Sequence, residues 1–422
     1  MWHKHEPSSF PGLFSYMSST HARRGAPNLA GLSRLLVLSA SYGEGHQQAA
    51  NAIRDAVQQQ SPNTQVEIID FMKSVHPVLD SVVKYCYLKS VRFAPALYGW
   101  FYYGTSQIAP SSLIQRQLNS LGIENLAEIL EEYQPDVVLA TFPTPAGVVS
   151  YLKQQGRTNV PLATVITDHA IHSQWIHPLT NMYFVGSEHV RKGLIARGID
   201  SRTIRITGIP VRPSFLESLD KGALRAKYGM ALNVPTVLVM GGAYGVMGDL
   251  LQICEELFQY PHPIQVIVVT GRNLRLKAQL DNAVKRATRP VSIFGFVSEV
   301  HELMSISDLV VTKAGGLTIS EALALQLPML LYRPIPGQEV QNANFLVNQG
   351  VAVLAHSRRE VSIHLLELLV NNPCRLRAMR EKAQGVRKLQ SAQEIAEGLI
   401  QIADGQAIGS SPYLYKWSST KQ

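Results

Sequence analysis

Short apolar runs rich in β-branched residues alternate along the chain with longer stretches in which apolar positions recur at helical spacing. A strand pattern followed by an amphipathic helix pattern, repeated many times, is typical of parallel sheets covered by helices on both faces. The sequence therefore predicts an α/β protein. The predicted strands lie at 34–39, 65–70, 136–141, 162–167, 235–240, 264–270 and 309–312.

The chain has 422 residues, which is more than one hydrophobic core usually serves. Two prolines and a glycine interrupt the pattern at 208–213 (GIPVRP), and a second strand series begins after them. We expect two doubly wound, Rossmann-like domains facing a central cleft. Their expected bounds are 31–213 and 214–405, the second ending in an amphipathic helix at 391–404, with flexible arms at 1–30 and 406–422.

The composition narrows the class of protein. Hydrophobic residues make up 46% of the chain and charged residues 17%, as in globular proteins. The three cysteines have no CxxC spacing, and no export signal or apolar run of about 18 residues is visible, which favours the cytoplasm. The net charge of +8 fits an anionic membrane surface, nucleic acid or plain solubility, but we expect no nucleic acid because no binding motif accompanies it.

A glycine turn follows the first predicted strand. In SYGEGHQQAA (41–50), two glycines allow a tight turn at the carboxyl end of the strand, where ligands bind in open α/β sheets. His46 then lies at the beginning of a helix, where an imidazole can accept a proton near neutral pH. The same spacing also fits an ordinary polar residue in a first helical turn.

Three further loops in the second half could bind a nucleotide sugar. Gly241 and Gly242 lie between a strand and a helix, and backbone N–H groups in such a turn can bind phosphate. In KAGGLTISE (313–321), the N–H groups of 316–318 could hold a diphosphate and Glu321 two ribose hydroxyls. Gln338 and Glu339 offer polar groups to sugar hydroxyls. Each loop alone fits ordinary loop chemistry, whereas the last two, together with the strand that ends at 293–297, favour a site.

These motifs resemble a known family. SYGEGHQQAA, GFV (295–297), KAGGLTISEAL and PGQEVQNA resemble motifs of the monogalactosyldiacylglycerol synthase and processive diacylglycerol β-glucosyltransferase family, within glycosyltransferase family 28. The resemblance extends from about 34 to 390. It implies the GT-B fold and inverting transfer of a hexose from UDP-glucose or UDP-galactose to 1,2-diacylglycerol, giving a β-glycosyl lipid.

The resemblance also implies roles for particular residues. His46 would be the catalytic base, and Asp168, in the segment TDHAIHSQW, would orient His46 or bind the acceptor. The backbone of Phe296 and Val297 would meet uracil. The other implied donor-binding residues are Gly241, Gly242, Gly315, Gly316, Thr318, Glu321, Gln338, Glu339 and Asn342, and the implied acceptor or membrane residues are Gly45, His169, Trp175, Lys84, Lys89, Arg92 and Trp100.

The segment 75–108 combines basic residues with many aromatic ones. This composition fits a packed core helix, and it also fits a membrane interface, where rings lie at headgroup level and cations meet anionic lipid. Because the family resembled acts on a lipid, we expect peripheral contact with the inner face of a membrane.

The sequence lacks the carboxylate pair that usually holds a metal ion beside a nucleotide sugar. No D-x-D triplet occurs, so we expect neither a metal ion nor another cofactor, and helix N-termini and a basic side chain would meet the charge on UDP.

Two other functions fit the same motifs: a UDP-GlcNAc transferase for a polyprenyl-linked cell-wall precursor, and a nucleotide-sugar sensor without catalysis. Gln338 and Glu339 can hydrogen-bond glucose or galactose alike.

Overall fold

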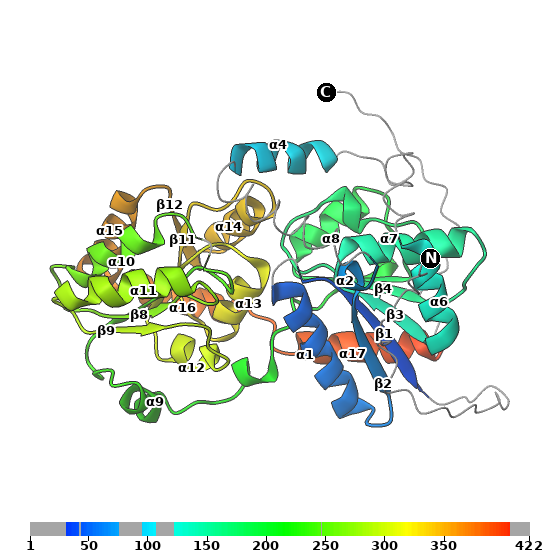
Figure 1. The fold of residues 1–422 in the computed structure, drawn as a ribbon, viewed down its shortest axis with the longest axis horizontal. Coiled ribbons are helices and arrows are strands. Elements are labelled where there is room, and N and C mark those ends of the chain that lie inside the picture. Colours follow the sequence, from blue (N-terminus) through cyan, green and yellow to red (C-terminus); the bar gives the residue numbers. More distant parts are fainter. Residues whose placement is uncertain (1–30, 42–43, 76–94, 107–121, 246, 406–422) are drawn as a thin grey trace, which may run out of the picture. The chain divides into compact units, whose positions relative to one another are not determined.

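In the computed structural model, two parallel six-stranded sheets form the framework of the chain (Figure 1). The structure describes residues 31–41, 44–75, 95–106, 122–245 and 247–405. The first sheet has the order β2-β1-β3-β4-β5-β6 and the second β12-β11-β10-β7-β8-β9. The strands of the first are β1 (Arg34–Ser39), β2 (Gln65–Asp70), β3 (Val137–Ala140), β4 (Leu162–Val165), β5 (Met182–Val185) and β6 (Ile204–Ile206), and those of the second are β7 (Thr236–Met240), β8 (Gln265–Val269), β9 (Val291–Phe294), β10 (Leu309–Thr312), β11 (Met329–Tyr332) and β12 (Ala352–Ala355).

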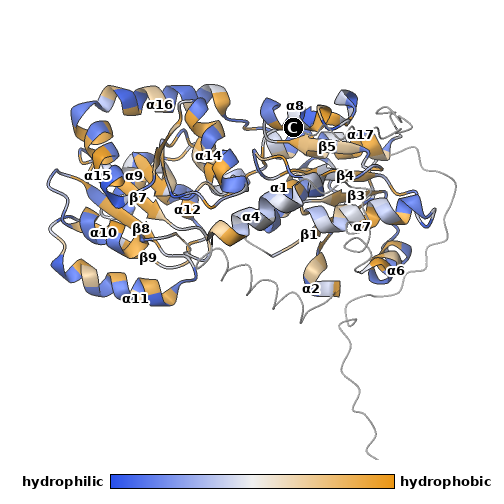
Figure 2. Cartoon of the chain, turned by 90° about the horizontal axis from the view of Figure 1, so that it is seen from above, coloured by the Kyte–Doolittle hydropathy of each residue, from blue (hydrophilic) through white to orange (hydrophobic). Residues whose placement is uncertain are grey.

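Helices cover both faces of each sheet. The strands are largely buried and apolar, whereas the outer helices carry hydrophilic and hydrophobic residues in alternation (Figure 2). This is the division expected when parallel strands are enclosed on both faces. The helices are α1 (Glu44–Gln60), α2 (Phe71–Val75), α4 (Pro95–Thr105), α6 (Ile123–Tyr133), α7 (Pro143–Gln154), α8 (Glu188–Ile195), α9 (Lys221–Lys227), α10 (Leu250–Phe258), α11 (Leu274–Ala283), α12 (Val300–Ser305), α13 (Gly316–Ala324), α14 (Gln338–Asn348), α15 (Arg358–Leu366), α16 (Pro373–Val386) and α17 (Ser391–Ala403), with short turns η1 (Ser173–Trp175), η2 (Ser201–Thr203), η3 (Pro213–Phe215), η4 (Val284–Arg286) and η5 (Glu367–Asn371).

The last helix does not belong where the sequence placed it. The sequence assigned the helix at 391–404 to the second domain, but α17 packs against α1 and the first sheet. Ile395 and Leu399 lie in the same core as Leu35 and Val37 of β1. An apolar stripe at helical spacing fits either sheet, so periodicity and chain order alone could not decide which core the helix completes.

Each sheet reverses its strand order at one point. In the first sheet the chain passes from β1 to β2 on one side and to β3 on the other, and in the second β7 lies between β8 and β10 in the same way. Loops at the carboxyl ends of the strands on either side of such a reversal separate and leave a crevice for a ligand. The fold therefore predicts ligand crevices beside the loops after β1, β3, β7 and β10.

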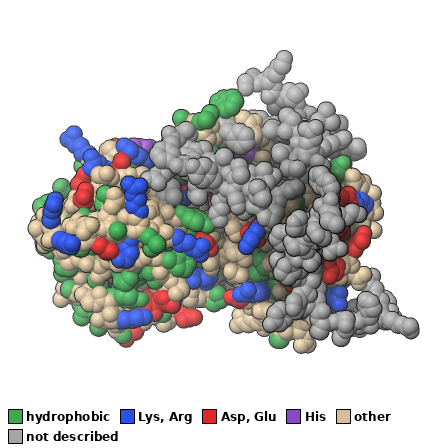
Figure 3. All heavy atoms as spheres, viewed as in Figure 1, with side chains coloured by type: hydrophobic (Ala, Val, Ile, Leu, Met, Phe, Trp, Pro, Cys, Tyr) green, Lys and Arg blue, Asp and Glu red, His purple; other side chains and the backbone are tan. Residues whose placement is uncertain are grey.

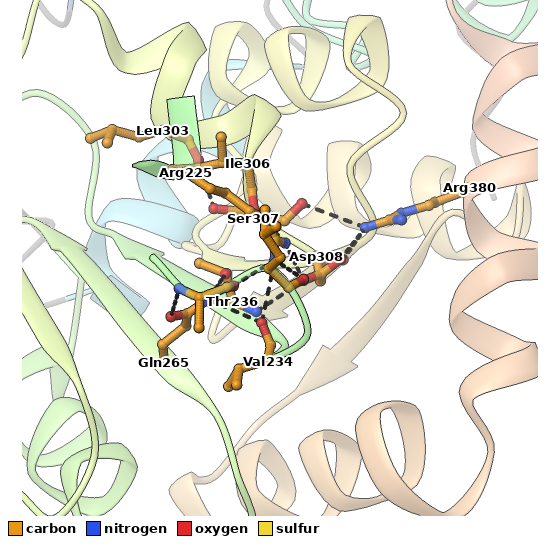
Figure 4. Close-up of polar contacts among 11 residues, drawn as sticks. Arg225, Val234, Thr236, Gln265, Leu303, Ile306, Ser307, Asp308 and Arg380 are labelled. Atoms are coloured by element: carbon orange, nitrogen blue, oxygen red, sulfur yellow. Dashed lines mark hydrogen bonds and ion pairs between the residues drawn. The ribbon is translucent and has the colours of Figure 1, made fainter. Parts of the chain in front are cut away.

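The opposite, amino ends of the second sheet are tied together by polar contacts (Figure 4). Asp308, just before β10, pairs with Arg225 of α9 at 3.0 Å and with Arg380 of α16 at 2.8 Å. Its Oδ2 atom also accepts a hydrogen bond from the backbone N–H of Thr236 at 2.9 Å. Gln265 donates to the Thr236 hydroxyl at 2.9 Å, so the network reaches β8 as well.

Candidate active site

A pocket of about 450 Å³ lies at the carboxyl ends of strands from both sheets. The first sheet contributes the loops after β1 and β4, and the second contributes the loops after β7, β8, β9, β10 and β11. The pocket thus includes the loops after β1, β7 and β10, three of the four loops beside the strand-order reversals, and not the loop after β3. Its lining includes the expected residues Gly45, His46, Asp168, Gly241, Gly242, Phe296, Val297, Gly315, Gly316, Thr318, Glu321, Gln338 and Glu339.

His46 lies in the first turn of α1 and faces this pocket. Its Nδ1 atom is 3.1 Å from the hydroxyl of Thr167, and its ring meets that of Phe142 edge-on at 5.2 Å. Burial lowers the pKa of His46 to about 4, although a hydrogen bond with the Thr141 backbone opposes the shift. The imidazole is therefore neutral at pH 7, which is the form that can accept a proton.

Asp168 also faces the pocket, but its contacts differ from those expected. Its Oδ1 atom accepts a hydrogen bond from Asn342 Nδ2 at 2.9 Å, whereas the hydroxyl beside His46 belongs to Thr167. Burial raises the pKa of Asp168 to about 6, with the Asn342 bond and Lys313 lowering it and Glu339 raising it. Thr167 is thus the residue placed to orient the imidazole, and Asp168 is a separate acidic group in the pocket.

Asn342 was expected to bind the donor, but its side chain instead links two loops of the protein by hydrogen bonds. It is fully buried, and its Nδ2 donates to Asp168 and to the Ala314 carbonyl, both at 2.9 Å. Its Oδ1 atom accepts the backbone N–H of His169 at 2.7 Å. Both donors and the acceptor of the amide are therefore engaged in joining the loop after β4 to the turn after β10.

Glycine turns supply the backbone donors of the pocket. Gly242 adopts a φ of +74°, a conformation that glycine reaches without strain. The N–H groups of Gly316, Leu317 and Thr318 open α13 and so lack intrahelical acceptors, and no side chain among the described residues caps them. A Cβ atom on Gly316 would lie 2.0 Å from the Thr167 carbonyl oxygen, so the close approach of these loops requires glycine. Free N–H groups at a helix beginning are suited to bind phosphate.

Charged side chains complete the pocket. Burial raises the pKa of Glu321 to about 7, opposed by Arg212, which lines the same pocket. Lys313 pairs with Glu339 at 2.6 Å, and the second oxygen of Glu339 accepts the Ile335 N–H at 3.1 Å. A diphosphate here would meet two cations beside the helix dipole.

Thr167, Arg212 and Lys313 line the pocket although the sequence did not predict them as site residues. Lys313 opens the KAGG turn and Arg212 lies within the GIPVRP seam, so both were inside motifs that we interpreted through their glycines and prolines. A search for basic residues beside the glycine turns could have found Lys313 and Arg212. Thr167 has no such signal, because its partner His46 is 121 positions away.

The expected acceptor residues are distributed unevenly. His169 is buried and stacks on Phe345 with ring centroids 4.0 Å apart, and burial lowers its pKa to about 3. Trp175 is buried as well, with its ring 6.4 Å from that of His46, so it does not face outward to lipid. Trp100 is 76% exposed on α4. Lys84, Lys89 and Arg92 lie outside the described residues.

Comparison with known proteins agrees with this geometry. Residues 46–211 match the family described as monogalactosyldiacylglycerol (MGDG) synthase, and residues 236–399 match the glycosyltransferase family 28 C-terminal domain. The proteins named processive diacylglycerol beta-glucosyltransferase from Bacillus cereus and Bacillus thuringiensis are each 34% identical to this chain, over 87% of its length and 93% of theirs.

Solved structures share the fold at low sequence identity. Acinetobacter baumannii MurG has a TM-score of 0.60 at 15% identity, covering 87% of this chain and 99% of its own. The Staphylococcus aureus MnaA structure with UDP has a TM-score of 0.61 at 14% identity, covering 90% and 98%. These likenesses concern the fold alone.

The two parallel sheets with a pocket at their carboxyl ends are therefore those of a GT-B glycosyltransferase, as the sequence predicted. Within that class, the extent of the match to the Bacillus proteins is decisive. The chain belongs to the monogalactosyldiacylglycerol synthase and processive diacylglycerol β-glucosyltransferase family.

Proposed function

We propose that this protein transfers a hexose from UDP-glucose or UDP-galactose to the free hydroxyl of 1,2-diacylglycerol with inversion at the anomeric carbon. The observation that carries the proposal is that one pocket holds the His46 imidazole together with N–H groups at the beginning of α13 for which the described residues provide no hydrogen-bond partner. The relatives' printed name, a diacylglycerol β-glucosyltransferase, supports the choice of donor and acceptor class.

The donor would occupy the part of the pocket formed by the second sheet. The backbone of Phe296 and Val297 would meet uracil, and Glu321 would accept hydrogen bonds from the ribose hydroxyls. The glycine turns, Arg212 and Lys313 would surround the diphosphate. Gln338 and Glu339 would contact the hexose, and these assignments are supported by the presence of all these residues in one lining.

The chemical step requires one proton transfer and one displacement. The acceptor hydroxyl would give its proton to His46 as its oxygen bonds to the anomeric carbon, and the bond from that carbon to the UDP oxygen would break with its electron pair leaving on UDP. Backbone donors and cations would stabilise the charge that develops on the diphosphate. Attack opposite the leaving group gives a β-glycoside.

We propose that no metal ion takes part. The sequence has no D-x-D triplet, and the described residues contain no group of three or more His, Cys, Asp or Glu side chains placed to hold an ion. Transfer in excess EDTA should equal transfer in added Mn²⁺ if the backbone donors and cations carry this role. Loss of activity in EDTA with recovery on adding Mn²⁺ would overturn it.

We also propose that α4 contacts the membrane surface that holds the acceptor, at the inner face. In the part of the chain that the structure describes, no helix combines the length and the apolarity needed to span a bilayer. Leu97, Trp100 and Tyr103 are 62%, 76% and 47% exposed on one side of α4, and hydrophobic side chains project in Figure 3 where Figure 1 places this helix. An apolar helix face on a chain of net charge +8 suits anionic lipid.

The transfer reaction tests the proposed function. Purified protein is incubated with diacylglycerol vesicles and, separately, UDP-glucose, UDP-galactose and UDP-N-acetylglucosamine, and the lipid product is identified by mass and linkage. A β-hexosyl diacylglycerol from one of the first two donors is the expected result. Transfer from UDP-N-acetylglucosamine to a polyprenyl-linked acceptor alone, or no turnover of any donor, would contradict it.

Vesicle co-sedimentation tests the membrane surface. Trp100→Ala should reduce binding to vesicles containing phosphatidylglycerol by about 5- to 10-fold, because burying an aromatic side chain contributes on the order of 1–3 kcal/mol. Leu274→Ala is the matched control, since Leu274 is 75% exposed on α11 of the second sheet. Equal binding by both variants would remove α4 from the contact.

A further inference from the structure

The inner side of α4 packs against the loop that precedes α14, where the expected sugar ligands lie. A Cβ atom on Gly99 would lie 2.5 Å from Cβ of Pro336, so the helix can approach this loop only because residue 99 is glycine. Gly337 has a φ of +113°, and a Cβ atom there would lie 2.9 Å from the ring of Tyr102. Glycine on both sides of the contact makes this close packing possible.

A hydrogen bond crosses the same contact. The hydroxyl of Tyr98 donates to Oε1 of Gln338 at 3.2 Å. Gln338 lines the pocket, but Tyr98 does not, so Tyr98 reaches the pocket through Gln338. Tyr98 and Gln338 are both half-buried, so water competes only partly for this bond.

This bond determines what Gln338 can offer to a ligand. With Oε1 accepting from Tyr98, the amide nitrogen Nε2 is the group of Gln338 for which the described residues provide no hydrogen-bond partner. An amide nitrogen can donate two hydrogen bonds, and a hexose presents hydroxyl oxygens that accept them. The neighbouring Glu339 is different, because Lys313 and the Ile335 N–H already engage its two oxygens.

We propose that Tyr98 is a positioning residue for the donor sugar, which fixes the Gln338 amide so that its nitrogen donates to a hexose hydroxyl. The inference rests on the proposed function, because it assumes that a UDP-hexose occupies the pocket. Tyr98 lies on α4, between β2 and β3 in the chain. A residue from the part of the chain that forms the first sheet would thus help to recognise a donor bound by loops of the second sheet. The helix α4, whose exposed side is apolar, thus also holds the Gln338 side chain in place for the sugar.

The test separates sugar recognition from nucleotide binding. Tyr98→Phe removes the hydroxyl and keeps the ring, and it should raise the KM for the UDP-hexose about 5- to 10-fold, as expected for one lost hydrogen bond. The affinity for UDP, which lacks the sugar, should not change in calorimetric titration. Tyr260→Phe is the matched control. The Tyr260 side chain packs in the hydrophobic core of the second sheet, and its hydroxyl is buried without a partner among the described residues.

A double-mutant cycle shows whether Tyr98 acts through Gln338. Gln338→Ala should raise the KM at least as much as Tyr98→Phe, and the double variant should match Gln338→Ala within about twofold, because the two residues form one interaction. An unchanged KM in Tyr98→Phe, full additivity in the double variant, or an equal loss of UDP affinity would each overturn the proposal. If the wild-type protein neither binds nor turns over a UDP-hexose, the proposed function fails instead.

Discussion

Asp308 and Asp168 both adjoin parallel strands, but they lie at opposite ends of their sheets and in different electrostatic surroundings. Asp308, at the amino end of β10, has two arginines and a backbone N–H as partners. Asp168, beyond the carboxyl end of β4, has a hydrogen bond from the neutral amide of Asn342, and burial raises its pKa to about 6. The first acid is paired with two cations, whereas the second has no ion pair among the described residues, which is the kind of surroundings often found in functional sites.

The same contrast holds for other groups. Glu321 has its pKa raised to about 7 by burial, and His46 has its pKa lowered to about 4, and both line the pocket. Gln265, at the amino end of β8, instead has its amide fully engaged by the Thr236 hydroxyl and the carbonyls of Val234 and Ala231. The pocket at the carboxyl ends thus holds three titratable groups with pKa values shifted by burial, His46, Asp168 and Glu321, beside the Lys313–Glu339 ion pair.

The largest expected effect is the loss of the imidazole. His46→Ala should lower kcat for transfer about 10²- to 10⁴-fold, the usual contribution of a general base. Its calorimetric affinity for UDP should stay within about twofold, because His46 is not among the groups proposed to bind UDP. A variant that binds UDP and keeps full transfer would exclude His46 as the base.

Asp308→Ala should have the largest effect on stability. It removes the partner of two arginines and the acceptor of the Thr236 N–H, so the free energy of unfolding should fall by about 2–4 kcal/mol. Urea unfolding measures this loss, and UDP affinity should be unchanged below the transition. Asp281→Ala, which removes an exposed pair with Lys277 on α11, is the control and should change stability by less than about 1 kcal/mol.

Asp168→Asn should act in the opposite sense on stability. The folded protein raises the Asp168 pKa from 3.8 to about 6, so the wild type loses stability as pH rises through this window. The variant lacks this loss, and its free energy of unfolding at pH 7.5 should exceed that of the wild type by about 1–3 kcal/mol. The gain should shrink as pH falls to 5.

Transfer by Asp168→Asn should nevertheless fall about 10-fold or more if the carboxylate serves the reaction. A variant that is less stable than the wild type at pH 7.5 would show that Asp168 is a structural acid like Asp308. Full activity at raised stability would leave Asp168 outside the reaction.

The smallest expected effect concerns Glu321. Because burial raises its pKa to about 7, the carboxylate forms between pH 6 and pH 8. An ionised carboxylate accepts stronger hydrogen bonds from ribose hydroxyls, so the affinity for UDP-glucose should rise about 3- to 10-fold across this range. Glu321→Gln should show a flat profile, and a wild-type affinity that is equally flat would remove Glu321 from ribose binding.

Local patterns were sufficient for much of the framework. The β-branched runs at 34–39, 65–70 and 309–312 are strands with those bounds, and the helices α1 and α13 begin where a strand pattern followed by glycines predicted a helix. The strands β5, β6, β11 and β12 were missed. They are runs of three or four residues, MYFV, IRI, MLLY and AVLA, which periodicity does not distinguish from helix segments.

Local sequence patterns could not predict contacts between residues that are far apart in the chain. The bridge from Asn342 to the backbone of His169 joins residues 173 positions apart, and it turns an expected sugar ligand into a structural one. The Tyr98 hydroxyl reaches Gln338 across 240 positions. The composition of 75–108 fitted a packed core helix as well as a membrane interface, so it could not predict that Trp100 is exposed or which side of α4 packs against the loop before α14.

The most direct test of the central claim is a calorimetric titration of the wild-type protein with UDP-glucose, UDP-galactose and UDP. We expect saturable binding at one site per chain for UDP and for at least one UDP-hexose, with an affinity in the micromolar to millimolar range usual for enzyme substrates. If UDP and both UDP-hexoses produce no binding heat and no saturation at several temperatures, the pocket does not hold a nucleotide sugar.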